Sequence, residues 1–113
     1  MPKKSETKVI KETNYCKIYS KVSIEDDEYN SCIERIEVKE KKREEIRFAL
    51  YKDTVRGDNR YVPRSLDVTE IQLLELIKKA IKEKVFSNEF IEMLQQELNN
   101  TVKKILIANK NSD

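Results

Sequence analysis

The hydrophobic pattern changes its period once, near residue 68, and this change constrains the fold more than any other feature of the sequence. Before it, apolar and polar residues alternate, which is typical of half-buried strands. After it, apolar residues recur at spacings of three and four, which is typical of amphipathic helices. Strands followed by helices define the α+β class. We therefore expect a small antiparallel sheet of three to four strands followed by two C-terminal helices packed on one face.

Four segments carry the strand pattern, at residues 15–24, 33–38, 46–51 and 61–66. In the first, strict alternation predicts one face made of Cys16, Ile18, Ser20, Val22 and Ile24, and another made of Tyr15, Lys17, Tyr19, Lys21 and Ser23. The fourth contains Pro63, which cannot donate to a strand ladder. We therefore expect the fourth strand to lie at an edge of the sheet or to break at Pro63.

Two helix starts can be recognised from their capping residues. Thr69 and Gln72 have the spacing of a capping box, in which each side chain satisfies a backbone donor of the other residue. Ser87 is a second candidate N-cap. These signals predict a first helix over residues 69–85 and a second over residues 87–109.

Six residues of the second helix repeat at spacings of three and four: Ile91, Leu94, Leu98, Thr101, Ile105 and Ala108. A near-heptad stripe of this kind is typical of a helix packed on its own sheet or of a helix paired with another helix. In the second case the end of the helix, residues 102–108, would overhang the sheet and pair with a second copy. The candidate oligomerisation residues are Ile91, Leu94, Leu98 and Ile105.

Chain length and apolar content favour one domain. We expect a disordered basic segment at residues 1–8 and a single domain over residues 9–113, of which residues 9–67 form the sheet. No apolar run approaches the roughly 20 residues of a membrane-spanning helix, and the first residues have no apolar signal segment. The sequence therefore predicts a cytoplasmic protein with no membrane partner.

Missing residue types exclude much of enzyme chemistry. The chain has no His and one Gly, so it has no Ser-His or Cys-His pair, no His-ligated metal and no glycine-rich phosphate loop. No carboxylate stands out as buried from its sequence context. The cysteines Cys16 and Cys32 are too few for a zinc site, and we expect buried thiols. We predict a protein that is not an enzyme, with no catalytic residues, no metal and no cofactor.

The net charge of +2 is unevenly distributed. Residues 1–24 contain six lysines against two glutamates, and residues 47–67 also carry excess positive charge, whereas residues 25–46 are acidic. Cations and aromatic rings on one sheet face suit single-stranded nucleic acid, because rings stack on bases and cations pair with phosphates. The candidate nucleic-acid-binding residues are Lys17, Tyr19, Lys21, Arg47, Tyr51, Arg60 and Arg64. The competing interpretation is an ordinary solvated sheet face.

One stretch of the sequence, residues 45–80, carries a resemblance to a known family. Glu45-Ile46-Arg47-Phe48-Ala49-Leu50 is an apolar and basic strand, Arg60 lies in the loop that follows, and Ser65-Leu66-Asp67-Val68-Thr69-Glu70 leads into an amphipathic helix. Residues 45–80 thus resemble the strand-turn-strand-helix half of the positive cofactor four type of transcriptional coactivator, a family that binds single-stranded DNA. The resemblance implies a four-stranded antiparallel sheet followed by a helix, dimerisation, and DNA held on the sheet. It would place Arg47 and Arg60 on the binding face and Thr69 at the helix start.

Two functions follow as hypotheses. The first is a small nucleic-acid-binding module, for single-stranded DNA or RNA, that works as a homodimer. The alternative is a protein-interaction or assembly module acting through its C-terminal helix, such as an accessory or inhibitor protein of a phage or mobile element. The expected partners are accordingly single-stranded nucleic acid, a second copy of the chain, or another protein.

Overall fold

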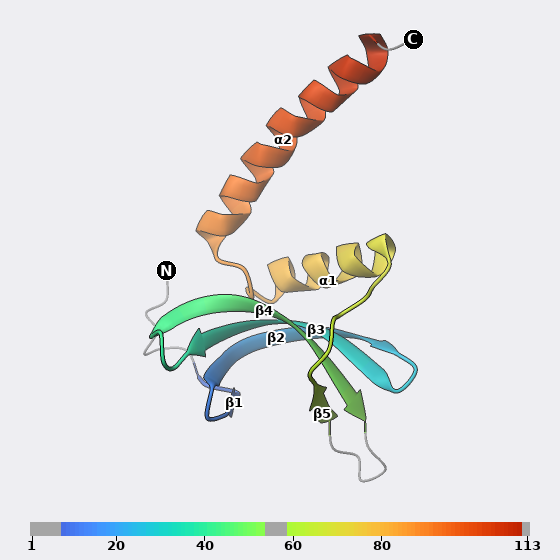
Figure 1. Ribbon diagram of the computed structural model, residues 1–113. Helices are drawn as coiled ribbons and strands as arrows, with labels where there is room; N and C mark the ends of the chain where they lie inside the picture. The colour runs from blue at the N-terminus through green and yellow to red at the C-terminus, as the bar shows by residue number, and fades with distance from the viewer. Residues whose placement is uncertain (1–7, 54–58, 112–113) are drawn as a thin grey trace.

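A computed structural model describes residues 8–53 and 59–111, and it forms an antiparallel five-stranded sheet followed by two helices (Figure 1). The elements are β1 (Lys11–Glu12), β2 (Cys16–Asp26), β3 (Tyr29–Val38), β4 (Arg43–Asp53), β5 (Asn59–Val62), α1 (Glu70–Lys82) and α2 (Asn88–Asn111). Each strand pairs with the next along the chain. The predicted α+β class is confirmed. The basic segment expected at residues 1–8 lies outside the described residues, apart from Lys8.

The sheet has one strand more than the largest number predicted. The extra strand, β1, has only two residues, which is too short to show an alternating pattern. At the opposite edge, β5 ends at Val62, directly before Pro63. The expectation of an edge strand interrupted at this proline is confirmed.

A β-bulge between Ile18 and Ser20 divides β2 into two parts. Ile18 pairs with Ile36, whereas Val22 pairs with Ile33, and Ile33 and Ile36 point to opposite faces of β3. The extra residue reverses the alternation of β2. The predicted single apolar face running from Cys16 to Ile24 is therefore wrong, because that face changes sides at the bulge.

The two faces of the sheet have different surroundings. We call the face that carries Val22 and Ile33 the helix face, because α1 covers it with Leu76 and Ala80. The opposite face, which carries Cys16, Ile18, Ile36 and Val38, is the inner face. Figure 1 shows that the sheet curls away from α1, so that β1 and β5 lie on the inner side.

The start of α1 matches its sequence signal. Thr69 and Gln72 form the predicted capping box, with the backbone N–H of each residue donating to the other's side chain at 2.9 and 3.1 Å. Lys79 also donates to the backbone carbonyl of Ser23 at 2.9 Å. These contacts fix α1 across β2 and β3, where its buried residues complete the main hydrophobic core.

The connection between the helices turns the chain away from the sheet. Lys84 has a φ of 58°, and the N–H groups of Lys84 and Val85 donate to the carbonyls of Ile81 and Ala80. These are the two hydrogen bonds of a Schellman motif, with lysine where glycine is usual. Arg35 on β3 anchors the turn by donating to the carbonyl of Val85 at 2.7 Å.

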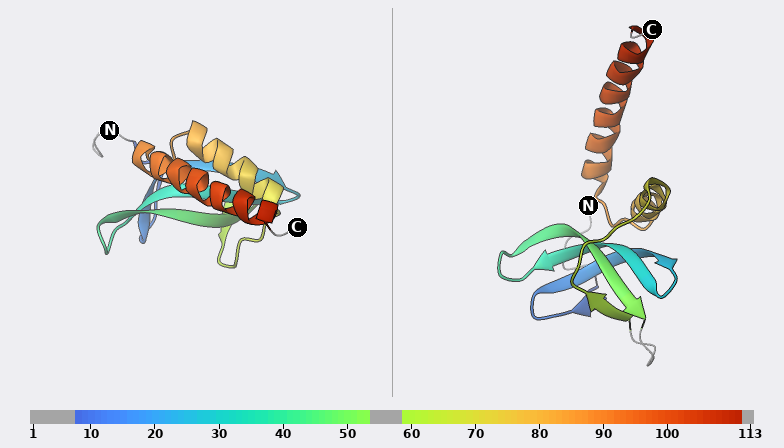
Figure 2. Two further views of the ribbon diagram at one scale, coloured as in Figure 1. Left: turned by 90° about the horizontal axis from the view of Figure 1, so that it is seen from above. Right: turned by 45° about the vertical axis from the view of Figure 1, so that its right-hand side comes forward.

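Helix α2 leaves the body of the protein, by which we mean β1 to β5 and α1 (Figure 2). Its predicted N-cap is confirmed, since Ser87 accepts from the backbone N–H of Phe90. Ile91 still packs against the main core, but every residue from 95 to 109 is exposed. The prediction that both helices pack on one face is wrong for the second helix. The space over the helix face is already occupied by α1, and the turn at Lys84 directs α2 away from the sheet.

Both cysteines are buried and free, which confirms the expectation of buried thiols. Among the described residues, no helix combines the length and apolar character needed to cross a membrane.

Candidate functional site in the inner face

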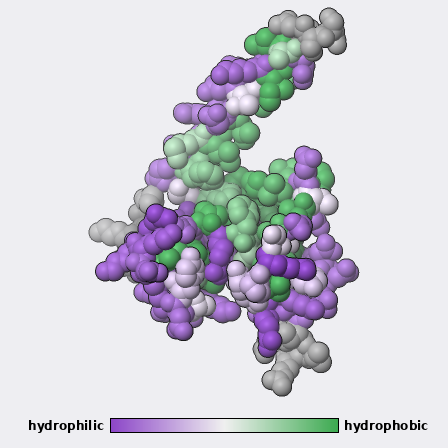
Figure 3. Space-filling model, viewed as in Figure 1, coloured by the Kyte–Doolittle hydropathy of each residue, from purple (hydrophilic) through white to green (hydrophobic). Residues whose placement is uncertain are grey.

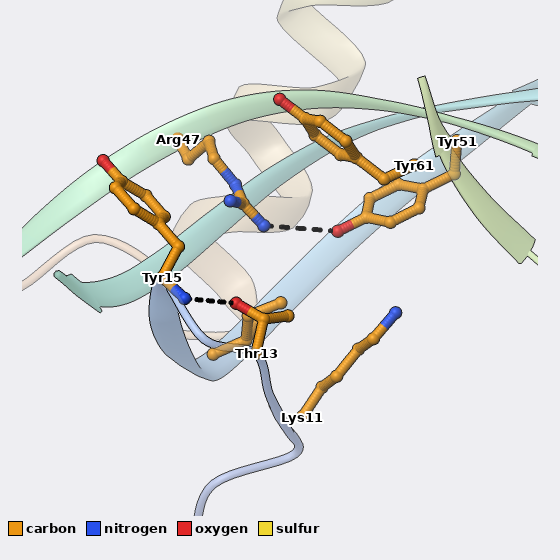
Figure 4. Close-up of a pocket in the computed structure, with 7 residues that line it drawn as sticks. Lys11, Thr13, Tyr15, Arg47, Tyr51 and Tyr61 are labelled. Carbon is orange, nitrogen blue, oxygen red and sulfur yellow. Dashed lines mark hydrogen bonds between the residues drawn. The ribbon is translucent and has the colours of Figure 1, made fainter. Parts of the chain in front are cut away.

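The inner face of the curled sheet borders a half-open cavity of about 510 Å³. Figure 4 shows that its walls come from both edges of the sheet, with Lys11, Thr13 and Tyr15 on one side and Tyr61 on the other. The remaining lining residues are Ile18, Arg47 and Tyr51. This volume lies within the range of about 300–1,000 Å³ typical of small-ligand sites.

A fully buried carboxylate organises the wall of this cavity. Glu34 on β3 is 0% exposed and accepts from the hydroxyl of Tyr51 at 2.6 Å and from Nε of Arg47 at 2.8 Å. Nη2 of Arg47 also donates to the Tyr51 hydroxyl at 3.4 Å. The Lys21 ammonium lies 3.8 Å from Glu34 and 3.6 Å from the centre of the Tyr51 ring. A buried carboxylate needs such partners, because an unpaired one would be costly.

Strand pairing brings these groups together. Glu34 pairs with Lys21 on β2 and with Arg47 on β4, so the three side chains lie in one row across the inner face. Tyr51 lies four residues after Arg47 on the same face of β4. The bulge in β2 is required for this row, because it turns Lys21 toward Glu34 rather than toward α1.

The network shifts the pKa values of its members. Burial, followed by the hydrogen bond to Glu34, raises the pKa of Tyr51 above its ordinary value. Burial acts to lower the pKa of Arg47, but the hydrogen bond and the charge of Glu34 outweigh burial and raise it. Tyr51 therefore stays a neutral donor and Arg47 stays a cation throughout the neutral pH range.

Aromatic rings and cations alternate along the cavity. The rings of Tyr51 and Tyr61 meet edge to face with their centres 5.8 Å apart. The Arg47 guanidinium carbon lies 5.3 Å from the centre of the Tyr61 ring, and the Lys11 ammonium lies 5.8 Å from that of Tyr51. Tyr15 is 52% exposed and Tyr61 is 46% exposed, so both rings can be reached from solvent.

The structure brings only some of the predicted nucleic-acid-binding residues together. Lys21, Arg47 and Tyr51 lie on the inner face around Glu34. Lys17 belongs to the opposite face, and the Tyr19 hydroxyl donates to Glu37 on that side at 3.1 Å. The bulge in β2 is the reason that Lys17 and Lys21 lie on opposite faces of the sheet.

The last two predicted residues, Arg60 and Arg64, also lie away from the cavity. Tyr61 on β5 faces inward, so its neighbour Arg60 points to the helix face. The Arg64 guanidinium lies 4.9 Å from the Tyr29 ring. Arg47 and Arg60, which the family resemblance implied on one binding face, are on opposite faces of the sheet.

Sequence reasoning missed four cavity residues and the buried carboxylate. Lys11 and Thr13 come from an edge segment too short to show a pattern. Tyr15 and Tyr61 lie in predicted strands but were not among the candidate binding residues. No carboxylate stands out as buried from its sequence context, yet Glu34 is completely buried. A signal for it was present, since Glu34 shares its two-residue period with Cys32, Ile36 and Val38. A single acidic residue on an otherwise apolar face of a strand indicates a carboxylate that is buried and has partners.

Cys32 lies two residues before Glu34 on β3, on the same face of the sheet. Burial raises the pKa of its thiol from 9.0 to about 11. A protonated, inaccessible thiol is a poor nucleophile. Within the described residues, no group of three or more Cys, Asp or Glu is arranged to hold a metal ion.

Comparison of the chain with models of protein families, with curated proteins and with solved structures finds no significant match. The chemistry of the cavity is therefore argued from its own geometry. Two cations, Lys11 and Arg47, line it together with three tyrosine rings, and Glu34 and Lys21 lie in the network of its wall, so the site suits an anionic ligand that carries a flat ring.

Proposed function

We propose that the inner face binds single-stranded nucleic acid, with one nucleotide held in the cavity. The observation that carries this proposal is the grouping of Tyr15, Tyr51 and Tyr61 with Lys11 and Arg47 around one cavity of about 510 Å³. A base can stack on an exposed tyrosine ring, and such stacking contributes about 1–3 kcal/mol per base. The cations supply the contacts to the phosphate backbone.

The buried network supports this function by holding Arg47 in place. A guanidinium has five N–H donors, of which Glu34 and the Tyr51 hydroxyl use two. The others remain for a phosphate oxygen. Because Glu34 fixes the guanidinium before a ligand arrives, less side-chain entropy is lost on binding.

Matched pairs of variants test the proposal. Fluorescence anisotropy of a labelled single-stranded oligonucleotide, measured over a series of salt concentrations, gives the affinity and its salt slope. We expect Tyr61→Ala to weaken binding about tenfold or more through lost stacking, and Lys11→Ala to weaken it and flatten the salt slope. Both side chains are on the surface of edge strands, so the variants should fold.

The controls are Tyr19→Ala and Lys17→Ala, which make the same changes on the opposite face. The proposal predicts that these variants bind like the unmodified chain. Loss of binding in the controls instead, or no binding of single strands by the unmodified chain at low salt, would overturn it.

A second function, self-assembly, is favoured by a separate observation, the exposed apolar residues of α2. It uses a different surface from the cavity, so the two functions are compatible.

A further inference from the structure

We propose that α2 pairs with α2 of a second copy of this chain, and that the two helices run antiparallel. The proposal goes beyond nucleic-acid binding and does not rest on it, because no residue of the cavity belongs to α2. It rests on three properties of α2: exposed apolar residues, a symmetric apolar spacing, and a division of charge between its two halves.

The first property is the amount of apolar surface that α2 leaves in solvent. Its exposed large apolar residues, with the fraction exposed, are Phe90 (39%), Met93 (62%), Leu98 (54%), Val102 (46%), Ile105 (52%), Leu106 (55%) and Ile107 (59%). Helices in proteins derive most of their stability from packing of an apolar side, and contiguous exposed apolar surface usually marks an interface. Among the described residues, packing against the main core is confined to the start of α2, where Ile91 packs against the core and the Phe90 ring meets Phe86 edge to face.

The second property is the spacing of the stripe. Its six residues, Ile91, Leu94, Leu98, Thr101, Ile105 and Ala108, are separated by three, four, three, four and three positions. This series reads the same in both directions, and its midpoint lies between Asn99 and Asn100. Two antiparallel copies centred there match every member of the stripe with another member. The layers are Leu98 with Thr101, Leu94 with Ile105, and Ile91 with Ala108, which alternate in the manner of a and d positions.

The third property is the charge distribution. In residues 88–99 the charged residues are Glu89, Glu92 and Glu97, and in residues 100–111 every charged residue is a lysine. Parallel pairing would place acidic half against acidic half and basic half against basic half. Antiparallel pairing places each acidic half against a basic half, which is favourable.

One ion pair follows from the register. Glu97 and Lys104 both take the position that flanks the seam next to the a residues, and equivalent flanking positions meet across an antiparallel pair. Glu97 of each copy would then lie beside Lys104 of the other copy. Within one chain these residues are two turns apart, about 10 Å along the helix axis, so they cannot satisfy each other.

The surroundings of α2 also suit this arrangement. Figure 3 shows that the apolar surface at the base of α2 continues over α1 and the adjoining sheet. In an antiparallel pair, the C-terminal end of the partner helix reaches this base. Its most apolar segment, Ile105, Leu106 and Ile107, then meets apolar rather than polar surface.

The first test measures the mass of the full chain by sedimentation equilibrium across a wide range of concentrations. We expect twice the mass of one chain, and a monomer for Leu98→Asp, which places a charge in the central layer. Circular dichroism and thermal unfolding of that variant show whether the body still folds. A monomer at every concentration for the unmodified chain would overturn the proposal.

The second test determines the orientation by exchanging charges. Glu97→Lys alone and Lys104→Glu alone should each weaken the dimer about tenfold, because each replaces two attractions with two repulsions. The double variant should restore the affinity. The matched control is Lys103→Glu, which makes the same charge change on the side of the helix away from the seam. Equal effects of Lys103→Glu and Lys104→Glu, or no rescue in the double variant, would overturn the antiparallel register.

The third test measures distance directly by pulsed electron resonance between nitroxide labels on the two copies. Labels at Asn100→Cys should lie close together, whereas labels at Glu89→Cys should be about 30 Å apart along the axis. The native cysteines are buried and should not take the label. A short distance at both positions means a parallel pair and contradicts the proposal.

Discussion

The body and α2 differ in how much of their apolar surface is covered, although α1 also has exposed apolar residues such as Ile71 (71%) and Leu74 (53%). In the body, Leu76 of α1 is 0% exposed, and even a glutamate, Glu34, is completely buried among partners from the two neighbouring strands. In α2, Leu98 is 54% exposed although it belongs to an apolar stripe with regular spacings of three and four. The difference teaches that periodicity identifies the side of a helix that will be covered, but not what will cover it.

The largest expected effect lies in the body. Glu34→Ala removes the common acceptor of Arg47, Tyr51 and Lys21 and leaves two cations near one another in a mostly buried row. We expect a loss of about 3–5 kcal/mol in the free energy of unfolding, measured by urea denaturation. Glu34→Gln keeps the shape and the acceptor oxygen, and its loss should be smaller. Equal stability of Glu34→Ala and the unmodified chain would mean that the network does not stabilise the body.

A pair of identical substitutions sharpens the comparison. Leu76→Ala leaves a cavity beneath α1 and should lower the free energy of unfolding by about 3 kcal/mol. Leu98→Ala, measured at concentrations where the chain is monomeric, should change it by less than about 0.5 kcal/mol. At higher concentrations Leu98→Ala should instead weaken association. A large loss for Leu98→Ala in the monomer would show that α2 belongs to the body after all.

A smaller effect than that of Leu76→Ala concerns pH and is confined to the body. The pKa of Cys32 is raised to about 11 in the folded protein, so the unfolded chain loses its thiol proton first as the pH rises. The stability due to the neutral buried thiol is therefore complete below about pH 9 and is lost as the pH approaches 11, by about 2 kcal/mol. Tyr51, whose pKa is also raised, adds to the fall.

Urea denaturation at several alkaline pH values checks this prediction. Cys32→Ala should have a shallower fall than the unmodified chain, and Cys16→Ala serves as its control. An identical pH profile for Cys32→Ala and the unmodified chain would contradict it.

Local signals in the sequence predicted the helical half of the fold well. The Thr69 capping box and the Ser87 N-cap depend on residues three positions apart, and both occur as expected. The direction of α2 could not be predicted in the same way. It depends on Lys84 adopting a left-handed conformation that lysine rarely takes, and on Arg35, fifty positions before Val85, holding the turn.

The candidate site was harder to predict, because a single extra residue at the β-bulge after Ile18 sets which side chains of β2 face the cavity. Strict alternation put Lys17, Tyr19 and Lys21 on one face, but the bulge after Ile18 separates Lys21 from the other two. The approach of the two edges of the sheet could not be predicted either, since Lys11 and Tyr61 become neighbours of Arg47 and Tyr51 only when the sheet curls. Sequence patterns report the period of a strand, whereas this cavity depends on curvature and on a break in that period.

The bulge in β2 determines which amino-acid substitutions in this strand can be compensated independently of one another. Cys16 and Ile18 pack with Ile36 and Val38, whereas Val22 packs with Ile33 and the helices. One strand thus supplies two separate cores, and residues on either side of the bulge have no packing neighbours in common within these clusters. Substitutions in the first half of β2 can therefore be compensated at the cavity without disturbing the helices. After the bulge, Val22 packs under α1, whereas Lys21 contacts Glu34 and the Tyr51 ring in the cavity wall. Only substitutions of the residues that face α1 can therefore be compensated there without altering the cavity.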